Sequence, residues 1–69
     1  MRNRAIYDYR IFPARVFLQV YGAVRFPDSY LSEDVETEAL TQAVAEGYWL
    51  HILTAEYAIL ERITNEPQD

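Results

Sequence analysis

The chain has 69 residues, which is one domain at most, and carries a net charge of −5 with neither cysteine nor lysine. The lack of cysteine excludes disulfide bonds and thiol nucleophiles, and the anionic balance disfavours direct nucleic-acid binding, which needs a clustered positive surface. An apolar content of 51% and a charged content of 25% exclude a disordered tail and indicate one small folded domain, expected over residues 1–69.

The N-terminal segment alternates between two faces in a way that favours β-strands. Residues 5–12 and 15–26 both alternate, and both are rich in β-branched and aromatic side chains. Pro13 and Ala14 would form the turn between them, because proline cannot donate a hydrogen bond within a sheet. This pattern predicts an N-terminal hairpin. The alternative is a helix with Pro13 in its first turn, since apolar residues also recur at helical spacing: Phe17, Val20, Tyr21 and Val24.

The central segment predicts a helix over residues 33–46. Ser32 is a candidate N-cap, acidic residues fill the first turn, and Gly47 is a candidate stop because glycine tolerates a left-handed conformation. Apolar residues recur at three- and four-residue spacing and form one stripe: Val35, Ala39, Leu40, Ala43 and Val44.

The C-terminal segment is ambiguous between one helix and two strands. A single helix over 48–64 would place the carboxylate of Glu56 inside an apolar stripe, where an unpaired charge is costly to bury. A break at 54–56 removes this conflict and predicts a strand over 48–53, followed by a second strand or a short helix over 57–64. Residues 65–69 are expected to form a polar, frayed tail.

Together these elements predict an α+β fold: a small antiparallel sheet with an N-terminal hairpin, the central helix 33–46, and a C-terminal strand or hairpin. A three-helix bundle is the alternative. A 14-residue helix is about 21 Å long and cannot cover both faces of such a sheet. We therefore expect an exposed aromatic face that forms an oligomer interface. The candidate interface residues are Tyr7, Tyr9, Phe17, Tyr21 and Trp49.

The chain offers little chemistry for catalysis, so we expect a protein that is not an enzyme. A nucleophilic serine needs an activating base, and His51 is the one histidine that could serve. His51 lies in an apolar run and is more typical of a core histidine than of a metal ligand. Two glycines cannot build a phosphate-binding loop. We expect neither a cofactor nor a metal.

No segment has the length or the apolar character of a membrane span. The longest runs without a charged residue, 16–24 and 47–55, are about nine residues each, whereas a spanning helix needs roughly 20 apolar residues. The sequence therefore predicts a cytoplasmic protein without a membrane partner.

The two halves of the chain carry opposite charge. Residues 1–27 hold five arginines and one acid, and residues 28–69 hold ten acids and one arginine. The halves could pair with each other, or the acidic half could bind a basic surface of another protein. In size and charge alone the chain is similar to phage-encoded anti-CRISPR proteins and DNA mimics.

These observations lead to two hypotheses of function. The first is an acidic inhibitor that docks on a basic nucleic-acid-binding surface of a partner protein. Its candidate contact residues are Tyr30, Glu33, Asp34, Glu36 and Glu38. The second is a homo-oligomeric adaptor or structural subunit held together by the aromatic face of the sheet.

Overall fold

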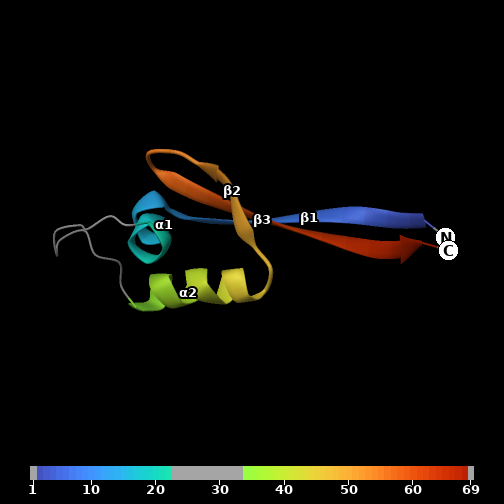
Figure 1. Cartoon of the computed structure of the whole chain (residues 1–69), viewed down its shortest axis with the longest axis horizontal. Helices are drawn as coiled ribbons and strands as arrows, with labels where there is room; N and C mark the ends of the chain where they lie inside the picture. The colour runs from blue at the N-terminus through green and yellow to red at the C-terminus, as the bar shows by residue number, and fades with distance from the viewer. Residues whose placement is uncertain (1, 23–33, 69) are drawn as a thin grey trace.

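A computed structural model describes residues 2–22 and 34–68, with side chains over 4–22 and 35–66. Within these residues the chain forms a three-stranded antiparallel sheet and two helices, which confirms the α+β class; the three-helix bundle is not supported (Figure 1). The elements are β1 (Arg2–Pro13), α1 (Ala14–Tyr21), α2 (Asp34–Ala45), β2 (Trp49–Leu53) and β3 (Tyr57–Gln68). The strand order is β1-β3-β2.

The predicted N-terminal hairpin is wrong, because the chain turns into helix α1 directly after Pro13. Pro13 has φ −58°, a value that suits the entry to a helix, and its missing N–H is one that the first turn would leave unpaired anyway. Helix α1 buries Ala14, Val16 and Phe17. The alternative prediction, a helix based on the helical spacing of the apolar residues, is therefore correct for this segment, and the strand based on their alternation is not. Strand β1 pairs with β3 instead, and residues 23–26 of the predicted strand lie outside the described residues.

Helix α2 confirms the predicted central helix and its stop. Gly47 has φ +102°, and two hydrogen bonds close the helix end: Gly47 N–H to Val44 O at 3.0 Å and Tyr48 N–H to Ala43 O at 3.0 Å. The apolar stripe is buried only in its second half. Leu40 and Ala43 lie in the core, whereas Val35 is 72% exposed.

Replacing Gly47 with alanine is expected to lower the free energy of unfolding by about 1–2 kcal/mol. An added Cβ would meet the Arg62 side chain at 3.5 Å, an ordinary contact, so the cost comes from the positive φ alone. Urea denaturation followed by circular dichroism measures the effect. Unchanged or increased stability would contradict this account of the helix end.

The break at 54–56 is confirmed, and the C-terminal segment forms two strands. Thr54 takes the place of the usual turn residues, because its hydroxyl oxygen accepts hydrogen bonds from Tyr57 N–H at 2.9 Å and Glu56 N–H at 3.2 Å. Glu56 is exposed, and its carbonyl accepts a hydrogen bond from Ala14 N–H at 2.9 Å, which ties the turn to the start of α1. Strand β3 continues to Gln68, so residues 65–68 pair with β1 instead of forming the expected tail.

One face of the sheet carries the core, and both helices pack on it. Ala58 and Leu60 of β3 are fully buried against residues of α1 and α2. Among the described residues the buried core cluster is small: Val16, Phe17, Leu40, Ala43, Tyr48, Ala58 and Leu60.

The sheet is long and uneven. Strand β2 pairs with β3 only from Ala58 to Glu61, so residues 2–7 and 63–68 form a two-stranded arm without a third strand. Figure 1 shows this arm reaching away from the helices towards both termini.

Candidate functional site

The side of the sheet opposite the helices is uncovered, and we call it the outer face. Side chains alternate along a strand, and Ala58 and Leu60 point to the helices, so the odd-numbered residues of β1 and β3 point the other way. Ile52 of β2 shares this face because it pairs with Ile59. The large side chains of the outer face are Tyr7, Tyr9, Ile11, Ile52, Tyr57, Ile59 and Ile63.

These side chains form cross-strand rows that remain accessible. Ile59 is flanked by Ile11 on β1 and by Ile52 on β2, and the two outer isoleucines are 64% and 46% exposed. Towards the arm, Tyr7 lies opposite Ile63, and both side chains are more than half exposed. The outer face is therefore an apolar surface that the described residues leave open to solvent.

A polar group lies between these two rows. Glu61 raises the pKa of Tyr9 above its usual value, first through hydrogen bonding with the phenol, with desolvation and the charge of Glu61 adding to it. His51 Nδ1 lies 3.9 Å from Glu61 Oε2. The expectation of a core histidine is wrong: β2 shifts register between Leu50 and Ile52, and the His51 side chain is exposed.

Charge is almost absent from the outer face. With the exception of Glu61, the charged residues of β1 and β3 whose side chains are described occupy even positions. Two ion pairs form there, Arg4 with Glu66 at 3.3 Å and Arg62 with Asp8 at 3.4 Å. The charged side chains of β1 and β3 therefore lie mainly on the helix side of the sheet, which also carries the core, and the outer face is mainly apolar.

The two oppositely charged halves of the chain do contact each other. The described residues form three arginine–carboxylate pairs, and each of them joins the N-terminal half to the C-terminal half: Arg4–Glu66, Arg15–Glu36 and Asp8–Arg62. Such exposed pairs contribute about 0–1 kcal/mol each, so their main consequence is to neutralise part of the acidic surface.

The structure tests little of the predicted acidic docking site. Tyr30 and Glu33 lie outside the described residues, and the side chain of Asp34 is not described. Glu36 accepts a hydrogen bond from Arg15 at 3.5 Å, whereas Glu38 is exposed on α2. Acidic docking by these residues stays a prediction.

The five candidate interface residues fall into two groups. Tyr7 and Tyr9 lie on the outer face. Phe17 is in the core, and its ring contacts the rings of Tyr21 at 5.3 Å and Trp49 at 5.8 Å between ring centres. Tyr21 and Trp49 are partly exposed, and although Trp49 pairs with Glu61, its ring lies against these two rings of α1. The sequence-based prediction of the interface did not include the isoleucines of the outer face. Ile59 and Ile63 do occupy every second position of their segment, as Tyr7, Tyr9 and Ile11 do in theirs.

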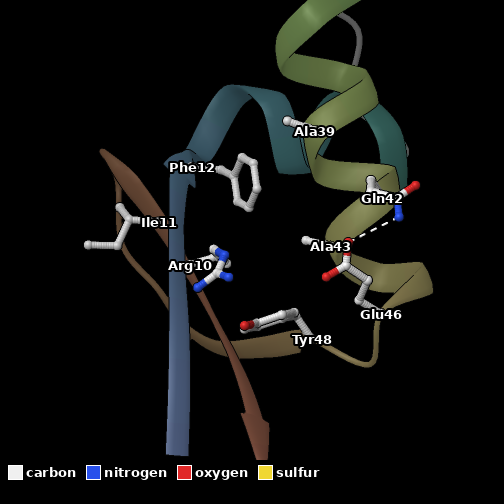
Figure 2. A pocket seen from close by; sticks show the side chains of 8 residues that line it. All are labelled: Arg10, Ile11, Phe12, Ala39, Gln42, Ala43, Glu46 and Tyr48. Atoms are coloured by element: carbon white, nitrogen blue, oxygen red, sulfur yellow. Dashed lines mark hydrogen bonds between the residues drawn. The ribbon is translucent and has the colours of Figure 1, made fainter.

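A cavity of about 420 Å³ lies on the helix side, between β1 and α2 (Figure 2). The Tyr48 ring borders it and contacts two guanidinium groups, those of Arg10 and Arg62, each 4.6 Å from the ring centre. Glu46 lines the cavity on the side of α2 and accepts a hydrogen bond from Gln42 at 3.0 Å. The Tyr48 hydroxyl is buried and has no hydrogen-bond partner among the described residues.

Replacing Tyr48 with phenylalanine is expected to raise the free energy of unfolding by about 1 kcal/mol, because the change removes an unpaired buried hydroxyl and keeps the ring that contacts the two arginines. Urea denaturation measures the difference. Tyr57→Phe, at an exposed position, is the matched control and should leave stability unchanged. A loss of stability in the Tyr48 variant would show that its hydroxyl is satisfied in solution.

Among the described residues, no group of three histidine, aspartate or glutamate side chains is placed to hold a metal ion. In the same part of the chain, neither helix has the length and apolar character needed to cross a bilayer. Comparison of the chain with known protein families, with characterised proteins and with solved structures found no match.

Proposed function

We propose that this chain is a non-catalytic protein-binding module that contacts its partner through the outer face. One observation carries the proposal: the sheet is covered by helices on one side, and the other side exposes a continuous set of isoleucine and tyrosine side chains. Contiguous exposed apolar surface on a small domain is typical of an interaction site, because leaving it in water is unfavourable.

The chemistry of the outer face fits a protein partner better than a nucleic acid. Tyrosine and isoleucine supply rigid apolar contact area, and the one charged side chain that the odd positions of β1 and β3 contribute is Glu61. Phosphate recognition would need arginines on this surface. In the part of the chain that the structure describes, Arg4, Arg10 and Arg62 all occupy even strand positions.

The acidic inhibitor hypothesis draws its support from the charge of the sequence, and the pairing of Glu36 with Arg15 reduces the free carboxylate surface that it invokes. Its own test is capture by basic nucleic-acid-handling proteins at rising salt. Capture that does not weaken with salt would remove its electrostatic basis.

Site-specific photo-cross-linking tests the proposed function. The photoreactive amino acid p-benzoylphenylalanine is placed at position 11, on the outer face, and in a control protein at position 41, on the exposed side of α2. We expect position 11 to give a covalent adduct with a protein identified by mass spectrometry, and position 41 to give none. Absence of any adduct from position 11 would contradict the proposal.

A further inference from the structure

We infer that the protein bound by the outer face is a second copy of this chain, packed face to face in antiparallel orientation about a two-fold axis that crosses the strands at the level of Tyr9 and Glu61. The inference rests on the proposed function and adds the identity of the partner and the geometry of the contact.

The size of the outer face suits a small symmetric dimer. From Ala5 to Pro13 on β1, eight residue steps span about 26 Å, and two to three strands are about 10–15 Å wide. Such a face covers about 260–390 Å² per copy, so two copies bury about 500–800 Å² in total, which is the size of a weak, transient contact. A weak, reversible dimer is the expected product.

The charge distribution favours self-contact at this surface. The chain has a net charge of −5, so two copies repel over most of their surfaces. On the outer face the negative charge is that of Glu61, which lies beside His51 and hydrogen-bonds with Tyr9. Two copies therefore repel each other less through this face than elsewhere, and the repulsion that remains is that between the two Glu61 carboxylates.

The spacing of the apolar rows fits an antiparallel arrangement. Tyr7 precedes Tyr9 by two residues and Ile11 follows it by two, so the Tyr7–Ile63 row and the isoleucine row are equally distant from the level of Tyr9 and Glu61. A two-fold axis at this level lays the Tyr7–Ile63 row of one copy over the isoleucine row (Ile11, Ile59 and Ile52) of the other. The contact is then self-complementary, as two-fold dimers require.

This arrangement also supports the arm. An isolated two-stranded ribbon is marginally stable in water, and the arm has no third strand and exposes both Tyr7 and Ile63. In the antiparallel dimer residues 5–7 of each arm lie over residues 11–13 of the other copy, which supply a second layer for this part of the arm.

Cysteine cross-linking tests the geometry, because the natural chain has no cysteine. Asn65 and Tyr57 lie at opposite ends of the outer face on β3, eight residues or about 26 Å apart. We expect a mixture of the Asn65→Cys and Tyr57→Cys variants, treated with a short bismaleimide, to form the mixed dimer well above either homodimer. Preferred cross-linking of Asn65→Cys to itself would overturn the antiparallel geometry.

A second variant tests the position of the axis. The axis brings the two Glu61 carboxylates towards each other, so Glu61→Gln should tighten self-association several-fold. Weaker association of this variant would overturn the central position of Glu61.

Failure of the inference is distinguishable from failure of the proposed function. If the cysteine variants give neither the mixed dimer nor a homodimer, and position 11 gives a photo-adduct with a different protein, self-association is overturned and the proposed binding module stands. If the cysteine variants give no cross-linked dimer and position 11 gives no photo-adduct, both self-association and the proposed function are overturned.

Discussion

Replacing Leu60 with alanine is expected to lower the free energy of unfolding by about 3–4 kcal/mol, the largest effect of any single truncation considered. Leu60 is fully buried on the central strand, where it pairs with Arg10 of β1 and with Leu50 of β2 and contacts the helical core residues. The lost side chain leaves a cavity that a rigid three-stranded sheet cannot close.

Such a loss is severe for a domain of this size, because small domains have about 5 kcal/mol of stability or slightly more. Urea denaturation at low protein concentration measures the effect without a contribution from self-association. Ile63→Ala on the same strand is the matched control and should cost less than about 1 kcal/mol, since Ile63 is exposed. Equal losses in the two variants would contradict the assignment of the core to the helix side.

Replacing Ile11 with aspartate is expected to weaken self-association about 100-fold or more. Ile11 is 64% exposed and lies in the isoleucine row, so the new carboxylate would be buried only in the dimer. The free energy of unfolding of the monomer should change little, because the core does not include this side chain.

Thr41→Asp is the matched control for this variant, because it adds the same charge at an exposed position of α2 on the other side of the sheet. Sedimentation equilibrium should give a dimer constant close to that of the natural chain for Thr41→Asp and no measurable dimer for Ile11→Asp. Equal weakening by both substitutions would show that net charge, and not the outer face, governs association.

The sequence predicts the local elements of this fold better than their pairing. Helix α2 and its end at Gly47 follow from the apolar spacing and from one glycine, and the turn at Thr54 follows from the cost of burying Glu56. Residues 15–21 satisfy both a strand period and a helix period. Contact of Val16 and Phe17 with Leu40 and Leu60 decides between them, and such contacts cannot be derived from a local pattern.

The outer face was predictable in part, because local alternation can be read from the sequence and strand pairing cannot. Alternation along β1 places Tyr7 and Tyr9 on one face, and a shortage of helical cover predicts that this face is open. The sequence does not reveal that β1 pairs with β3, because the two strands lie at opposite ends of the chain. Without that register, Ile59 and Ile63 cannot be assigned to the same surface as Tyr7, and His51 cannot be placed beside Glu61.

The most direct measurement of the central claim is the mass of the natural chain by sedimentation equilibrium, from about 10 µM to about 1 mM, a range that detects weak dimers. An outer face that binds a second copy predicts a mass that rises from that of one chain towards that of two. A mass that stays at one chain up to the highest concentration would contradict self-association through the outer face.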